Sequence, residues 1–292
     1  MYLSSRNQAG SPSNSDGSCL FKSLSVYYAV RFYEGLVNPE LAMPEYLKWL
    51  LLFGVGTIAG IINVNAGGGS SLTLPALIFI GLDGALANGT NRIGILLQTA
   101  TAVSSFRQQK VHRFRMSLTL ALFTLPGAVA GALLSVRISN EWFHRILGMV
   151  MIGIVISLFF PKPKGTLLAD TENHGKSWLI YPAMLGIGFY GGFIQIGVGF
   201  LLMAALYHLL RVSLVHVNMH KVFIICLYTI PALVIFVLTG HVNCGYGLCL
   251  AGGMAFGGWC GARIAVRGGE RIIRIILALA ILIMSMKILN II

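Results

Sequence analysis

The chain is built from two weakly similar halves, and this repeat constrains its fold more than any other feature. The segment from Gly127 to Arg137 recurs, with the same glycine spacing, as the segment from Gly257 to Arg267. The Gly-x-x-x-Gly pair that begins at Gly56 recurs at Gly188. Repeated apolar halves are typical of secondary transporters, in which a binding site forms where the two halves meet.

The composition indicates a membrane protein. Of the 292 residues, 56% are hydrophobic and 10% are charged, whereas soluble proteins carry about 25% charged residues. Several apolar runs approach the ~20 residues that a helix needs to span a bilayer. We therefore expect an all-α polytopic protein of the cell membrane, either a plasma membrane or a bacterial inner membrane.

The net charge of +12 is best explained by topology. Most basic residues lie in short loops between apolar runs, as expected of loops that stay in the cytoplasm. The basic and aromatic patterns that bind nucleic acids are missing, so a nucleic-acid partner is not expected. The five cysteines show no C-x-x-C spacing, and neither a metal nor a cofactor is expected.

The apolar segments number five in each half. In the first half they lie near 47–66, 70–82, 86–106, 116–136 and 142–160. In the second half they lie near 178–197, 199–210, 214–239, 244–266 and 271–291. The second segment of each half has only about 12 or 13 residues, and at ~1.5 Å per residue it cannot cross a ~30 Å core. Each half therefore contains either a re-entrant hairpin or a broken helix.

Both alternatives leave an odd number of crossings per half, which predicts two inverted repeats of about five helical segments each. The expected organisation is an N-terminal tail over 1–46, a first repeat over 47–160, a cytoplasmic linker over 161–177 and a second repeat over 178–292. Within the tail, residues 20–36 are expected to form an interfacial helix. Loop charges place 106–115 inside and its counterpart, 239–244, which has no Lys or Arg, outside. This alternation fits inversion and also places the amino-terminal tail outside, which its three basic residues do not support.

A polar, glycine-rich stretch from Asn63 to Ser71 interrupts the first apolar run. Its three consecutive glycines each cost a helix about 1 kcal/mol relative to alanine, so one helix should end here and a short one begin at Ser70 or Ser71. Non-helical backbone at membrane depth lines a cavity or is buried in protein. A short helix that begins there would direct free N–H groups at an anion. The Gly-x-x-x-Gly pairs, in contrast, are expected to serve close helix packing.

Two basic residues stand inside apolar segments. Arg92 lies in the third segment, and Lys221 follows 129 positions later in the eighth. A charge at membrane depth costs several kcal/mol and usually marks function. All nine acidic residues fall in tails, loops or segment ends, so a mobile anion is the expected partner. The alternatives are an ion pair with Asp83 and snorkelling of the side chains to the membrane surface.

These elements define an expected substrate site. His220 in it is also a candidate carrier of a coupling proton, because a histidine titrates near neutral pH. The expected substrate-binding residues are Asn63, Asn65, Gly67, Gly68, Gly69, Ser70, Ser71, Thr90, Asn91, Arg92, Gln195, Gly197, Gly199, Asn218, His220 and Lys221.

The pattern of a Gly-x-x-x-Gly pair, a triple-glycine break, a short helix with Pro75 and the Gly89-Thr90 element resembles the sulfite exporter TauE/SafE family of membrane permeases. The resemblance covers residues 47–291. It implies export or uptake of small sulfur-containing or organic anions, such as sulfite or sulfoacetate, and it places 63–71 and 90–92 at the site. The second half departs from this pattern, because its break lacks the triple glycine.

The expected function is thus a secondary transporter for a small anion, working by alternating access. An anion channel is the nearer alternative. An intramembrane serine hydrolase, with Ser70 or Ser71 as nucleophile and His216 or His220 as base, is the more distant one, since no Gly-x-Ser-x-Gly motif is present. No phosphate-binding Gly-x-x-x-x-Gly-Lys motif is present either. The glycine faces also allow a homo-oligomer.

Overall fold

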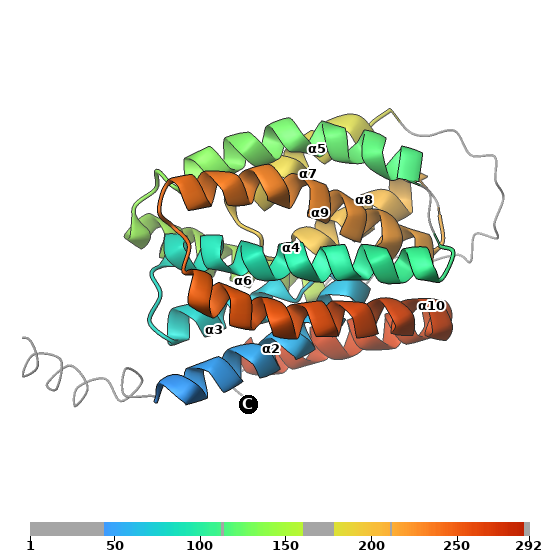
Figure 1. Ribbon diagram of the computed structural model, residues 1–292. Helices are drawn as coiled ribbons and strands as arrows, with labels where there is room; N and C mark the ends of the chain where they lie inside the picture. The colour runs from blue at the N-terminus through green and yellow to red at the C-terminus, as the bar shows by residue number, and fades with distance from the viewer. Residues whose placement is uncertain (1–43, 112–113, 160–177, 211, 289–292) are drawn as a thin grey trace, which may run out of the picture. The chain divides into compact units, whose positions relative to one another are not determined.

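The computed structural model describes residues 44–111, 114–159, 178–210 and 212–288, and all regular secondary structure in them is helical (Figure 1). The helices are α2 (Glu45–Asn65), α3 (Ser70–Phe79), α4 (Gly84–Gln108), α5 (Phe114–Ser135), α6 (Asn140–Phe159), α7 (Ile180–Phe193), α8 (Val198–Leu210), α9 (Leu214–Leu238) and α10 (Cys244–Ile288). Four of them are long and apolar enough to span a membrane, over Glu45–Asn65, Arg115–Ser135, Leu214–Leu238 and Cys244–Gly268. The prediction of a polytopic helical membrane protein is confirmed.

The two halves contain matching series of helices. Each begins with a helix that is broken for four residues, at 66–69 in the first half and at 194–197 in the second. A short apolar helix follows each break, α3 or α8. A 25-residue helix comes next, α4 or α9. The predicted breaks and short segments are therefore present, with α3 beginning at Ser70 as expected.

The last two expected segments, 244–266 and 271–291, are not separate, and this expectation is wrong. The helix α10 runs without interruption from Cys244 to Ile288. In the first half, the corresponding boundary has Ser139, whose hydroxyl accepts from the Trp142 amide at 3.5 Å and whose carbonyl accepts from the Phe143 amide. The second half has Arg-Gly-Gly-Glu there, with no Ser, Thr, Asp or Asn to cap a new helix.

The predicted tail, its interfacial helix over 20–36 and the linker over 161–177 lie outside the described residues. The orientation of the two halves in the membrane, and hence their inversion, stays a prediction.

Each half packs its fourth helix against the other half. The helix α5 packs mainly on α7 and α9, and α10 packs mainly on α2 and α4, as Figure 1 also shows. The helices α4 and α9 contact each other between these two groups. Contacts of this reciprocal kind are what a two-fold relation between two similar units produces.

Glycines make the closest of these contacts. A Cβ atom added to Gly56 or Gly60 of α2 would lie 2.7 Å from the carbonyl oxygen of Leu250 or Met254 of α10. The equivalent glycines of α7, Gly188 and Gly192, are pressed in the same way against the backbone of α5. The Gly-x-x-x-Gly pairs thus serve close helix packing, as expected.

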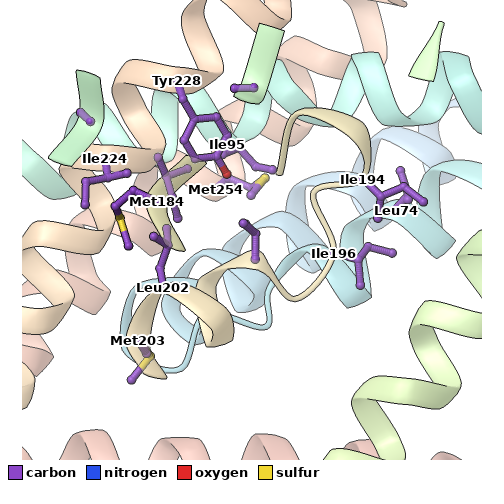
Figure 2. Packing of buried hydrophobic residues seen from close by; sticks show 14 of the residues in the cluster. Leu74, Ile95, Met184, Ile194, Ile196, Leu202, Met203, Ile224, Tyr228 and Met254 are labelled. Carbon is purple, nitrogen blue, oxygen red and sulfur yellow. The ribbon is translucent and has the colours of Figure 1, made fainter. Parts of the chain in front are cut away.

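A large apolar cluster surrounds the second break. Figure 2 shows Ile194 and Ile196 of that break with Leu74 of α3, Leu202 of α8 and Tyr228 of α9, all of them buried. All residues of both breaks, 66–69 and 194–197, are buried, so their irregular backbone is shielded from lipid.

Candidate functional site

The first break presents amide groups that have no acceptor among the described residues. Gly67 takes φ +87°, a conformation that favours glycine, and this turns the chain from α2 into α3. The amides of Ser71, Leu72 and Thr73 bond back to the carbonyls of Gly68 and Gly69. No side chain caps the helix start. Among the described contacts, none uses the N–H groups of Gly68, Gly69 and Ser70, so the amino end of α3 is an open donor site.

The second break has the same construction. Gly197 takes φ +72°, and its carbonyl accepts from the amides of Phe200 and Leu201 at the start of α8. The Tyr190 hydroxyl donates to the Ile196 carbonyl at 2.6 Å and fixes the turn. The amides of Val198 and Gly199 donate to no described acceptor.

The two breaks touch each other through glycines. A Cβ atom on Gly67 would lie 2.7 Å from the Cα atom of Gly199 and from the Phe200 amide nitrogen. A Cβ atom on Gly199 would lie 2.5 Å from the Gly67 carbonyl oxygen. The amino end of α8 therefore abuts the first break, and two helix amino ends are brought to the meeting point of the two halves.

Arg92 is fully buried at the second break. One guanidinium nitrogen, Nη1, donates to Gln195 Oε1 at 2.9 Å, and the other, Nη2, donates to the Gly192 carbonyl. Both are 3.3 Å from the Gly191 carbonyl oxygen. The guanidinium also lies over the Phe236 ring, 4.7 Å from its centroid. Arg92 thus binds the carboxyl end of α7, where a helix dipole is negative.

Lys221 is fully buried at the first break. Its Nζ atom donates to the Val64 carbonyl at 2.7 Å and to Asn218 Oδ1 at 2.8 Å. Val64 is the last residue but one of α2, as Gly192 is of α7. Each basic side chain therefore binds the equivalent carbonyl of the opposite half.

Two asparagines repeat this reciprocal pattern. Asn88 Nδ2 donates to the carbonyl of Phe193, the last residue of α7, at 2.9 Å. Asn218 Nδ2 donates to the carbonyl of Asn65, the last residue of α2, at 3.5 Å. The last two carbonyls of both half-helices are thus bound by an amide and a cation from the other half.

The expectation that a mobile anion is the partner of the buried cations was incomplete. Both have backbone carbonyl partners, which carry no sequence signal. Neither forms an ion pair with a carboxylate in the described part of the chain, and the Asp83 carboxylate accepts from Asn140 Nδ2 at 3.4 Å. Neither snorkels to the surface, since both are fully buried.

Within the described residues, several buried polar atoms of α2, α3 and α4 have no hydrogen-bond partner. Asn91 is fully buried, and both its amide atoms are unpaired there. Arg92 Nε, Thr73 Oγ1 in the first turn of α3, and Asn65 Oδ1 are also unpaired. Buried polar groups are nearly always satisfied in proteins, so these donors and acceptors are an indication of a polar ligand.

Other predicted site residues make structural contacts. Thr90 Oγ1 accepts from the Asn243 amide at 2.9 Å and holds the turn into α10. Asn63 Nδ2 donates to Gln98 Oε1 at 2.9 Å. Asn65 Nδ2 donates to the Gly261 carbonyl at 3.1 Å, which ties the end of α2 to α10. The Ser71 hydroxyl donates to the Gly68 carbonyl at 2.6 Å and stabilises the first break.

The histidines contact serines outside the expected site. His220 Nδ1 lies 2.7 Å from Ser117 Oγ on α5, and His216 Nδ1 lies 2.8 Å from Ser213 Oγ. Neither serine is one of the nucleophiles expected of a hydrolase. Within the described residues, no group of three potential metal ligands occurs.

Three contributors were missed at the sequence level. Asn88 could have been found, because it precedes Asn218 by 130 positions, close to the other repeat distances. Ser117 and Gln98 could not, since a single hydroxyl or amide in an apolar helix shows no pattern.

Comparisons with known proteins agree with this architecture. The chain matches the sequence profile of the family described as sulfite exporter TauE/SafE over residues 52–288. It is 28% identical over 241 residues to the probable membrane transporter protein ORF9 of Sinorhizobium, covering 82% of this chain and 91% of that one. It is 28% identical over 253 residues to the probable membrane transporter protein YfcA of Escherichia coli, covering 86% and 93%. No solved structure matches the chain. The chain therefore belongs to the sulfite exporter TauE/SafE family of membrane transporters.

Proposed function

We propose that this protein is a secondary transporter for a small sulfur-containing or organic anion, such as sulfite or sulfoacetate, and that the anion binds where the two helix breaks meet. One observation carries the proposal: two helix amino ends whose N–H groups use no described acceptor converge at the Gly67–Gly199 contact, and each of the two breaks binds a buried cation. Helix amino ends bind oxyanions through their N–H groups and their dipole.

The electrostatics favour an anion. Each break joins a carboxyl end, with roughly −0.5 of a charge, to an amino end, with roughly +0.5, so the dipole charges nearly cancel. The positive charges of Arg92 and Lys221 are then left over. No carboxylate in the described residues balances them. A bound anion supplies the missing negative charge at a depth where an unbalanced charge is costly.

The unpaired polar groups near the start of α3 and α8 and on α4 would donate hydrogen bonds to the anion. The free amides at the start of α3 and α8, Asn91 Nδ2 and Arg92 Nε are donors. The oxygens of a sulfite or sulfonate group accept such hydrogen bonds, which are stronger than neutral ones because the acceptor is charged.

Alternating access follows from the reciprocal arrangement, in which one half rocks against the other around a central site. The rival function, an anion channel, would use the same charges without coupling. His220 remains the proposed carrier of a coupling proton. Membership of a transporter family favours transport over the hydrolase alternative.

Thermal unfolding of the detergent-purified protein tests the anion site. Sulfite, sulfate, thiosulfate, sulfoacetate, taurine and acetate would each be titrated against wild type and Asn91→Ala. A ligand at a hundred times its dissociation constant stabilises the folded state by about 2.7 kcal/mol. We expect stabilisation by one anion class, with an affinity about 10- to 100-fold lower in Asn91→Ala, since a hydrogen bond to a charged group contributes about 1.5–3 kcal/mol. Stabilisation by no anion would refute the site.

A further inference from the structure

The two buried cations bind helix ends where other broken-helix transporters hold a mobile cation. In such transporters, Na⁺ is coordinated by unwound carbonyls and by the carboxyl ends of half-helices, while the amino ends face the anionic substrate. Here the carboxyl ends of α2 and α7 bind Lys221 Nζ and the Arg92 guanidinium. The carbonyls of Val64 and Gly192 are therefore already used.

The hydrogen bonds made by the two cations follow the same pattern in both halves. Arg92 is the ninth residue of α4 and Lys221 the eighth residue of α9. Each side chain crosses to the half-helix of the opposite half. In each case an asparagine of the same helix binds the next carbonyl along, that of Phe193 or Asn65. Together they bind the last two carbonyls of both half-helices.

We propose that Arg92 and Lys221 are tethered replacements for coupling metal cations, so that this protein binds and moves its anion without Na⁺. A covalently attached ammonium or guanidinium group fills the position at the helix end permanently. Its occupancy does not depend on the cation concentration on either side of the membrane. The coupling of transport to a Na⁺ gradient through these helix ends is thereby excluded.

The inference rests on the proposed function only for its transport measurement, and a stability measurement without any anion substrate tests it separately. The unfolding temperature of wild type would be compared in NaCl and in N-methylglucamine chloride. We expect the two values to agree within about 1 °C, because a ligand without a site gives no stabilisation. A clear increase in NaCl would overturn the proposal.

Chemical rescue tests the tethered charge directly. Lys221→Ala removes the ammonium and leaves the Val64 carbonyl unpaired, so we expect a lower unfolding temperature that methylammonium partly restores. Arg92→Ala should respond to low millimolar guanidinium in the same way. Arg263→Ala is the matched control. Arg263 stacks on the Trp259 ring at 3.7 Å and binds no described helix end, so its loss should not be rescued.

A second pair of variants keeps the test decisive if the alanine variants do not fold. Lys221→Arg keeps the charge, whereas Lys221→Met keeps most of the stem without it. We expect Lys221→Arg to unfold closer to wild type. Equal stability of wild type and Lys221→Met would overturn the proposal, because the charge would then be unnecessary.

Uptake into proteoliposomes supplies the last measurement, with sulfite as the probe. We expect the initial rate to change by less than about twofold when N-methylglucamine replaces Na⁺ on both sides, since the helix ends bind no mobile cation. Sulfite uptake that requires Na⁺ would refute the proposal that Arg92 and Lys221 replace coupling metal cations. It would leave the proposed anion transport unaffected. Loss of all sulfite uptake, with Na⁺-independent stability and rescue retained, would refute the proposed substrate alone.

Discussion

Asn88 and Asn91 lie one turn apart on α4 and are both fully buried, yet only one of them has its amide nitrogen bound. Asn88 Nδ2 donates to the Phe193 carbonyl and to Ser135 Oγ at 3.1 Å, whereas neither amide atom of Asn91 has a partner. The free energy that folding gains from the two residues must therefore differ. An unpaired buried amide lowers stability, and the proposed anion would supply the missing partner of Asn91.

Replacing each asparagine by alanine separates these roles. We expect Asn88→Ala to lower the free energy of unfolding by about 1–2 kcal/mol, because the Phe193 carbonyl loses its donor. Asn91→Ala should leave it unchanged or raise it, since an unpaired buried amide is removed. Thermal unfolding in the absence of added anions measures both. A loss in Asn91→Ala as large as that in Asn88→Ala would show that Asn91 is structural.

The glycine contact between the breaks gives a second prediction at this scale. Gly199→Ala introduces a Cβ atom against the Gly67 backbone and should cost about 2–3 kcal/mol or more. Gly240→Ala is the control for backbone conformation alone, because Gly240 has φ +74° and nothing within 4 Å. It should cost about 1–2 kcal/mol. Gly67→Ala combines both penalties and should be the least stable. A Gly199→Ala protein as stable as wild type would mean that the breaks do not touch.

The sequence predicted which polar residues lie at the breaks better than it predicted their hydrogen-bond partners. The sequence indicated Arg92, Lys221 and Gln195 as site residues, and the structure brings them to the two breaks. It could not indicate that their acceptors are backbone carbonyls, because every residue has one. Nor could it separate Thr90, which holds the turn at Asn243, from its neighbour Asn91.

At the scale of elements, small residues fix how the broken helices pack. On α2, Gly56 is pressed against Leu250, whereas Gly54 has nothing within 4 Å. On α7, Gly188 is pressed against Thr124, and Gly186 has nothing within 4 Å. Each half therefore offers a tight glycine and an open glycine two residues apart on one helix.

These pairs predict opposite effects of the same substitution. Gly56→Ala and Gly188→Ala should each lower the free energy of unfolding by about 1–3 kcal/mol, because the helices must separate. Gly54→Ala and Gly186→Ala should leave it unchanged or raise it by up to about 1 kcal/mol, through the higher helix propensity of alanine. The free energies of unfolding of the four purified variants, compared with wild type, test this prediction. Equal effects within a pair would contradict the packing of α2 on α10 and of α7 on α5.

Helix breaks were predictable because they have local causes. Consecutive glycines and polar residues end α2, and the short helix begins at Ser70 as predicted. The continuity of α10 was not predictable from hydrophobicity, which falls at Arg267–Arg271 without a capping residue to stop the helix. Apolar runs show where a helix can lie in lipid, whereas the helix ends depend on capping.

At the scale of the whole molecule, the two halves contact each other reciprocally, through packed helices and through polar side chains. The fourth helix of each half packs on the other half, and the cation of each half binds the broken helix of the other. The repeat in the sequence indicated two similar units. It could not show these reciprocal contacts, since similarity between segments carries no information on which of them touch. Movement of one half would therefore displace the broken-helix ends of the other, which line the proposed site.

We propose above that a small anion binds where the two helix breaks meet and is carried across the membrane by alternating access. Proteoliposomes preloaded with unlabelled sulfite would be diluted into trace radiolabelled sulfite, with sulfoacetate as a second probe. We predict transient accumulation of label by counterflow in wild type, and its reduction by about 10-fold or more in Asn91→Ala, whose anion loses a charge-assisted hydrogen bond. Anion conductance without counterflow, or equal counterflow in both proteins, would contradict the account.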